Sequence, residues 1–152
     1  MVNFFPTNYV ILEGPDLSGK TSMYNKIHEL SNYAWNIQDR SGISMVLFSK
    51  LYEREHFHVL ENLLYEIKNL NNVHIILLPK WETIVNRYNF RGDDIHDLVS
   101  LRKVYCDFEK AAEELSLYSN IMVLKSEELE SSAKQICEML LSREECSLKD
   151  VA

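Results

Sequence analysis

The chain has 152 residues, of which 46% are hydrophobic and 26% are charged, so we expect a single folded domain over residues 1–152. The formal net charge of −7 provides no overall basic surface. This weighs against general binding to nucleic acid, because such binding depends on lysines and arginines that replace counterions.

Hydrophobic runs and amphipathic stretches alternate along the first half of the chain. Apolar runs predict one strand over residues 9–12 and another over residues 33–37. Between them, apolar side chains at helical spacing predict a helix over residues 20–30, and a longer amphipathic stretch predicts a helix over residues 52–70. The first strand ends at Gly14, and we expect it at the centre of a sheet.

The second half continues the same alternation. Residues 73–78 form the clearest predicted strand and are closed by Pro79. Helices follow over residues 81–88 and 98–115, then a strand over residues 121–124 and a last helix from residue 129 to about residue 140. This order predicts a three-layer α/β fold, with a small, mostly parallel sheet flanked by helices.

The strongest motif lies between the first predicted strand and the first predicted helix. Residues 14–21 match G-x-x-x-x-G-K-[ST], the P-loop pattern, in the context that its mechanism needs. Backbone N–H groups would hold the β-phosphate of ATP, Lys20 would reach the β- and γ-phosphates, and the Thr21 hydroxyl would bind Mg²⁺. The alternative is a glycine turn with an exposed lysine. The predicted ATP-binding residues are Gly14, Pro15, Asp16, Leu17, Ser18, Gly19, Lys20, Thr21 and Ser22.

Asp39 and Arg40 follow the second predicted strand, at the sheet edge where open α/β folds bind their ligands. There Asp39 could hold a magnesium-bound water, or could accept a proton from an attacking hydroxyl. Arg40 could bind the phosphate of the acceptor with two hydrogen bonds. The alternative is an exposed helix-capping aspartate next to a surface arginine.

Arg87 and Arg91 lie in a segment that could close over a bound nucleotide. Such lids exclude water and bring arginines to the phosphoryl group in transfer. A solvated polar loop is the other interpretation of this segment.

The residues Leu12-Glu13-Gly14-Pro15-Asp16, followed by Ser18-Gly19-Lys20-Thr21, resemble the phosphate loop of thymidylate kinases and the related deoxynucleoside kinases. The resemblance implies that Asp16 contacts the deoxyribose of the acceptor. Asp39-Arg40-Ser41 resembles a second motif of this family, whose arginine binds the 5′ phosphate or hydroxyl of the acceptor.

The resemblance extends more weakly through the second half of the chain. The segment from Leu77 to Arg91 is similar to the strand, proline turn and arginine lid of the family. Arg102 and Tyr105 resemble residues of its next helix, which would make them acceptor-binding residues. Family geometry also implies that Lys125 and Ser126 lie near the adenine.

The sequence departs from the family pattern at two places. Leu17 stands where the family usually has a glycine, which affects how closely the loop approaches the acceptor or the phosphates. Asp39-Arg40 also follows the loop very soon, whereas family members usually insert a further strand and helices that build the acceptor pocket.

Three hypotheses for function follow. The first is ATP- and Mg²⁺-dependent phosphoryl transfer to a deoxynucleoside monophosphate, by a thymidylate kinase-like enzyme with a small nucleotide or nucleoside acceptor. The second is a polynucleotide hydroxyl kinase with Asp39 as its general base, because the spacing from Lys20 to Asp39 resembles those enzymes. The third is a nucleotide-binding module without catalysis.

Other sequence features give only general expectations. Cys106, Cys137 and Cys146 form no C-x-x-C pair, and residues 1–6 resemble neither a signal peptide nor a membrane anchor. We therefore expect a cytoplasmic protein with reduced thiols and no membrane partner. The apolar stripe of residues 98–115 could support a homodimer, although packing in the core explains it equally well.

Overall fold

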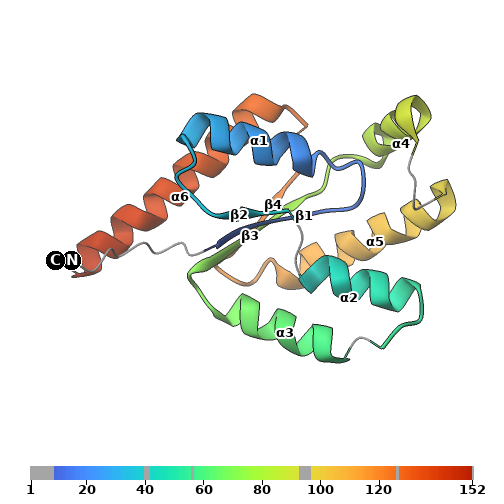
Figure 1. The fold of residues 1–152 in the computed structure, drawn as a ribbon, viewed down its shortest axis with the longest axis horizontal. Coiled ribbons are helices and arrows are strands. Elements are labelled where there is room, and N and C mark those ends of the chain that lie inside the picture. Colours follow the sequence, from blue (N-terminus) through green and yellow to red (C-terminus); the bar gives the residue numbers. More distant parts are fainter. Residues whose placement is uncertain (1–8, 40–41, 56, 93–96, 126, 152) are drawn as a thin grey trace.

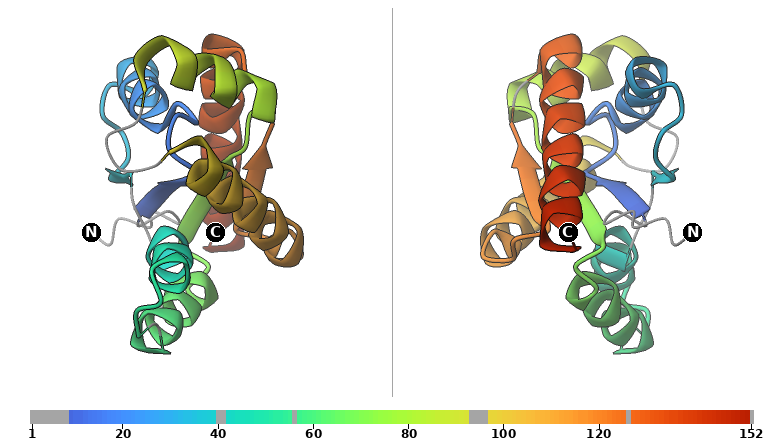
Figure 2. Two further views of the ribbon diagram at one scale, coloured as in Figure 1. Left: turned by 90° about the vertical axis from the view of Figure 1, so that its right-hand side faces the viewer. Right: turned by 90° about the vertical axis from the view of Figure 1, so that its left-hand side faces the viewer.

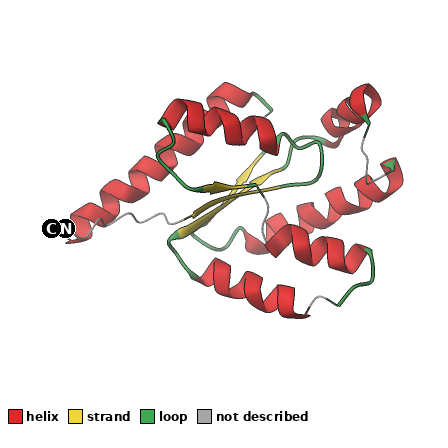
Figure 3. Ribbon diagram, viewed as in Figure 1, coloured by secondary structure: helices red, strands yellow, loops and turns green. Residues whose placement is uncertain are grey.

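The computed structural model describes residues 9–39, 42–55, 57–92, 97–125 and 127–151. Their centre is a sheet of four parallel strands in the order β2-β1-β3-β4 (Figure 1). The strands are β1 (Tyr9–Glu13), β2 (Ile37–Gln38), β3 (Asn72–Leu77) and β4 (Ile121–Leu124). Strands and helices alternate along the chain (Figure 3), which confirms the predicted α/β fold.

Helices cover both faces of this sheet. On one face lie α1 (Lys20–Ser31) and α6 (Leu129–Val151), and on the other lie α2 (Gly42–Leu51), α3 (Phe57–Lys68) and α5 (Leu98–Leu115), as Figures 1 and 2 show. The remaining helix, α4 (Trp81–Arg91), begins after β3 at the edge where the parallel strands end.

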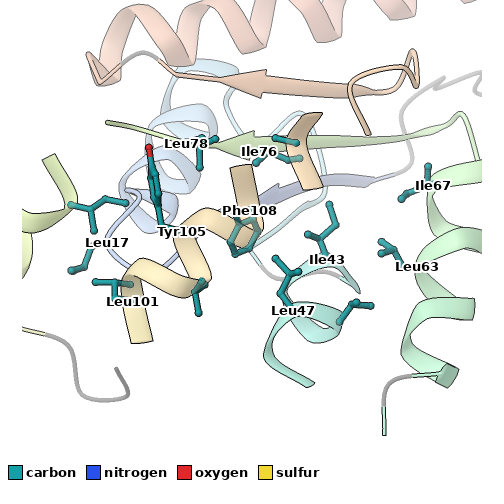
Figure 4. Close-up of a cluster of buried hydrophobic side chains, with 14 residues drawn as sticks. Leu17, Ile43, Leu47, Leu63, Ile67, Ile76, Leu78, Leu101, Tyr105 and Phe108 are labelled. Atoms are coloured by element: carbon teal, nitrogen blue, oxygen red, sulfur yellow. The ribbon is translucent and has the colours of Figure 1, made fainter. Parts of the chain in front are cut away.

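The two faces of the sheet form two separate hydrophobic cores. Val10 and Leu12 of β1 pack with α1 and α6, as does Ile75 of β3. Ile76 of β3 belongs to the opposite core, with residues from α2, α3, α4 and α5 (Figure 4). Because successive side chains of a strand point to opposite faces, the continuous apolar run of β3 supplies both cores.

Two predicted elements differ from the structure. The strand expected over residues 33–37 is only Ile37–Gln38, because Asn32 and Tyr33 have φ angles of 53° and 60°, in the left-handed region, and form the turn after α1. The helix expected over residues 52–70 begins at Phe57, and α2 is a helix that no apolar period in the sequence predicted. The apolar side chains of α2 are not confined to one stripe, since Val46 is buried while Met45 beside it is half-exposed.

Within the described residues, no helix is both long and apolar enough to cross a membrane. Cys106 and Cys137 are free thiols, and the side chain of Cys146 lies outside the part that the structure describes.

His74 of β3 is the most unusual polar residue of the core. Its side chain is fully buried, and Nε2 has no hydrogen-bond partner among the described residues. A carboxylate oxygen of Glu66 on α3 lies 3.7 Å from its Nδ1. Burial lowers the pKa of His74 from 6.5 to about 4, so the imidazole is neutral in the folded protein at pH 7.

His74 should therefore make the fold sensitive to acid. The unfolded chain takes up a proton near pH 6.5 and the folded chain only near pH 4, so stability is lost as the pH falls through this range. As the pH falls from 7 to 4, the unfolding free energy of the unmodified chain should drop by about 3 kcal/mol more than that of His74→Leu, which lacks the buried imidazole. Urea unfolding at a series of pH values measures this difference.

The control for this experiment is His58→Leu, because the His58 side chain on α3 is 82% exposed. This substitution should leave the pH dependence of the unfolding free energy as it is in the unmodified chain. An equal response of the two variants to pH would contradict the assignment to His74.

Candidate functional site

The loop between β1 and α1 depends on two glycines. A Cβ atom on Gly14 would lie 2.5 Å from the carbonyl oxygen of Leu77, so no larger residue fits at this position. Gly19 has a φ of 94°, which L-residues rarely adopt. Gly14 is thus required by a close approach of the backbone, and Gly19 by its backbone conformation.

The N-terminus of α1 and the side chain of Lys20 both lie at this loop. Gly19 is the N-cap of α1 and no side chain caps the helix, whose positive end faces the loop. The Nζ atom of Lys20 donates a 2.6 Å hydrogen bond to the carbonyl oxygen of Gly14, across the loop. A helix N-terminus beside a lysine is suited to bind a phosphate anion.

Leu17 stands at the position where glycine was expected, and it combines an unusual backbone angle with a buried side chain. Its φ is 69°, an uncommon value for a residue with a side chain, and that side chain is buried at 8% exposure. It belongs to the core on the α5 side, and Figure 4 shows it beside Leu101 and Tyr105. The side chain of Leu17 therefore anchors the loop to the core.

A cavity of about 590 Å³ lies between the loop, α4 and the start of α6. Its walls include Gly19, Met23, Arg87, Arg91, Leu124 and Glu127. This volume is within the range of small-molecule sites, and apolar walls with a few charged groups are typical of them. The cavity adjoins the end of the loop at the N-terminus of α1, since Gly19 lines it.

Arg87 joins α4 to the loop. Its Nη1 donates a 2.6 Å hydrogen bond to the carbonyl oxygen of Leu17, and it lines the cavity together with the exposed Arg91. The structure thus brings both predicted lid arginines to the loop and its cavity.

Glu127 joins the same helix to the segment after β4. One carboxylate oxygen accepts hydrogen bonds from Thr83 Oγ1 at 2.6 Å and from the backbone N–H of Lys80 at 3.1 Å. These bonds, that of Thr83 first, lower the pKa of Glu127. Lys80 is the N-cap of α4, so the carboxylate also lies at the positive end of that helix. Lys125 is exposed on the same segment, and Ser126 lies outside the described residues.

Asp39 lies at the same edge of the sheet as the loop. The register pairs Ile11 of β1 with Gln38 of β2, so Asp39 follows beside Leu12, just before the loop. Both Asp39 and Thr21 are exposed. No group of three or more His, Cys, Asp or Glu side chains is arranged to hold a metal within the described parts of the chain. One hydroxyl and one carboxylate nevertheless fit Mg²⁺ in a kinase, since the phosphates and water supply most of its ligands.

The other predicted acceptor residues lie in different surroundings. Arg40 falls outside the described residues. Asp16 is half-buried in the loop. The Arg102 guanidinium lies 4.8 Å from the centre of the Trp81 ring, and the buried Tyr105 donates a 2.7 Å hydrogen bond from its hydroxyl to the carbonyl oxygen of Pro79. Arg102 and Tyr105 thus form one cluster with Trp81 where α4 and α5 meet.

The arrangement of strands and loop is that of known kinases. A structure of deoxyadenosine kinase from M. mycoides with the products dCMP and dCDP bound aligns with a TM-score of 0.60 at 12% identity, covering 88% of this chain and 99% of that one. Shikimate kinase from Acinetobacter baumannii, in complex with shikimate, aligns with a TM-score of 0.50 at 16% identity, covering 91% of this chain and 96% of that one. The chain has the fold of the P-loop kinases. Sequence comparison with protein families and with curated proteins finds no match.

One residue of this P-loop kinase fold received no role in the sequence analysis. Glu13, the last residue of β1, is fully buried, and its carboxylate accepts a 2.6 Å hydrogen bond from the Ser44 hydroxyl of α2. Burial raises its pKa from 4.5 to about 7. A single acidic residue at the end of an apolar strand was the only signal in the sequence, and its partner lies on the helix that was not predicted.

The backbone conformation of Leu17 leads to a prediction about stability. Glycine adopts a φ of 69° without strain, whereas alanine does not, so Leu17→Gly should be about 1 kcal/mol more stable than Leu17→Ala. Both variants lose the buried side chain and should unfold at lower urea concentration than the unmodified chain.

Leu47 of α2, which lies in the same core, is the matched control. In the interior of a helix the order reverses, and Leu47→Ala should be about 1 kcal/mol more stable than Leu47→Gly. The same order of stability at both positions would show that residue 17 does not hold its left-handed backbone in solution.

Proposed function

We propose that this chain transfers a phosphoryl group from ATP to a deoxynucleoside monophosphate, in the manner of the thymidylate kinases. The observation that carries the proposal is the loop of residues 14–21, which joins a helix N-terminus, Lys20 and a nucleoside-sized cavity at one edge of the sheet. The shared fold with the P-loop kinases supports it. The proposal places the protein in the cytoplasm.

The donor side would use the loop and the lid together. Backbone N–H groups and Lys20 would hold the β- and γ-phosphates, and Arg87 and Arg91 would stabilise charge on the phosphoryl group in transfer. Mg²⁺, held by Thr21 and Asp39 with the phosphates, would neutralise part of this charge. Since Arg87 already contacts Leu17 in the loop, α4 needs little movement to bring its arginines to a bound nucleotide.

The acceptor would lie on the other side of the loop, near Asp39 and α2. Asp16, Arg40, Arg102 and Tyr105 remain our candidates for binding it. A second candidate reaction is transfer to a hydroxyl, which the exposed carboxylate of Asp39 beside the loop favours, because a hydroxyl needs a base. Polynucleotides are disfavoured as acceptors by the net charge of −7.

The direct test is ATP consumption with product identification, against deoxynucleosides, their monophosphates and a 5′-hydroxyl oligonucleotide at two salt concentrations. We expect transfer to a monophosphate with little effect of salt. Lys20→Ala should lower the rate about 100-fold or more, because it removes a charge that stabilises the transition state. Lys26→Ala, further along α1 with its Nζ 3.4 Å from Glu29, is the control and should retain full activity.

Two outcomes of this test would reject the proposal. Labelling of the oligonucleotide alone, with a rate that falls steeply as salt is added, would identify a polynucleotide kinase. Binding of ATP without transfer to any acceptor would identify a nucleotide-binding module.

Asp39→Asn separates a base from a magnesium-organising carboxylate. A hydroxyl acceptor needs proton removal, so the variant should lose about 100-fold or more of its activity on a deoxynucleoside. A monophosphate is already ionised, so the loss on that acceptor should stay below about tenfold. Initial rates on both acceptors measure the difference. If the variant is as fast as the unmodified protein on each acceptor, Asp39 has no role in the reaction.

A further inference from the structure

A buried carboxylate lies where the strand meets the phosphate-binding loop. Glu13 precedes Gly14, and none of its surface is exposed. Burial of a carboxylate is unfavourable, and one of its oxygens, Oε1, has no hydrogen-bond partner among the described residues. Packing alone would be served by an apolar residue such as Ile11, which is the preceding residue of β1 on the same face.

The other oxygen connects two parts of the candidate site. Oε2 accepts the 2.6 Å hydrogen bond from Ser44, a buried residue in the first turn of α2. The backbone of Ser44 also forms a hydrogen bond that favours the charged carboxylate. Glu13 therefore lies at the positive end of α2, where a negative charge is favourable.

The charges near Glu13 belong to the same region. Lys20 of the loop favours the charged form of this carboxyl group, whereas Glu66 of α3 opposes it. Glu13 is thus in electrostatic contact with the lysine on the donor side and in hydrogen-bond contact with the helix that follows Asp39 on the acceptor side.

We propose that Glu13 is a positioning residue, which fixes the first turn of α2 relative to the phosphate-binding loop. It acts through Ser44 and touches no substrate, since its side chain is fully buried. The inference rests on the proposed function, in which the acceptor lies between the loop and α2.

Ser44→Ala tests this role with the smallest change. We expect the acceptor KM to rise about tenfold, which corresponds to loss of one hydrogen bond. The value of kcat, and the Kd of a fluorescent ATP analogue, should stay within about twofold of the unmodified protein. Ser132→Ala, a buried serine on α6, is the control and should change none of these constants.

Substitutions of Glu13 provide a second test. Glutamine retains an oxygen that accepts a hydrogen bond from Ser44, so Glu13→Gln should recover much of the acceptor binding that Glu13→Ala loses. Hydrogen exchange should show faster exchange of the first turn of α2 in Glu13→Ala, with α3 and α5 unchanged. An unchanged acceptor KM in Ser44→Ala, or an equal loss of ATP-analogue affinity, would overturn the proposal.

Failure of the proposed function gives a different result. In that case the unmodified protein transfers phosphate to no acceptor, while the exchange measurement still decides the role of Glu13. Faster exchange confined to the first turn of α2 would support it, and unchanged exchange would overturn it.

Discussion

Strand β1 can continue into the loop of residues 14–21 only because Gly14 has no side chain. Its Cα lies so close to the carbonyl oxygen of Leu77, at the end of β3, that a Cβ would come within 2.5 Å of it. The central pair of strands therefore fixes where the loop begins. From that point the loop has to turn back to α1, which Gly19 permits through its positive φ angle.

Leu17 holds the loop through both its side chain and its backbone. The Leu17 side chain packs into the core beside α5, and its carbonyl oxygen accepts a hydrogen bond from Arg87 of α4. A loop with two glycines would otherwise be flexible, so these contacts reduce its conformational freedom. The strain of a left-handed leucine is offset by the burial of its side chain.

Glu127 and Glu13 are two acidic residues near this loop that differ in their surroundings. Glu127 is exposed and accepts hydrogen bonds at the start of α4, so its pKa is lowered. Glu13 is buried, so its pKa is raised to about 7. Glu127 joins α4 to the segment after β4, and Glu13 joins β1 to α2. Each carboxylate thus fixes one helix relative to the cavity or the loop.

The sequence by itself determined the elements whose signal is local. The glycine pattern of residues 14–21 required a strand before it and a helix after it, and the helix Leu98–Leu115 and the strand Ile121–Leu124 were predicted at their observed bounds. In these segments the period of the apolar residues follows directly from the geometry of a helix or a strand. The placement of Asp39 beside the loop also followed, because parallel strands end at one edge.

Only the tertiary structure decided how the loop is held. Helix α2 has apolar residues outside a single stripe, so no period revealed it, and the turn at Tyr33 depends on backbone conformation. The contacts of Glu13 with Ser44 and of Arg87 with Leu17 join residues 31 and 70 positions apart. Such contacts depend on how whole helices pack on the sheet, and the local sequence does not record that packing.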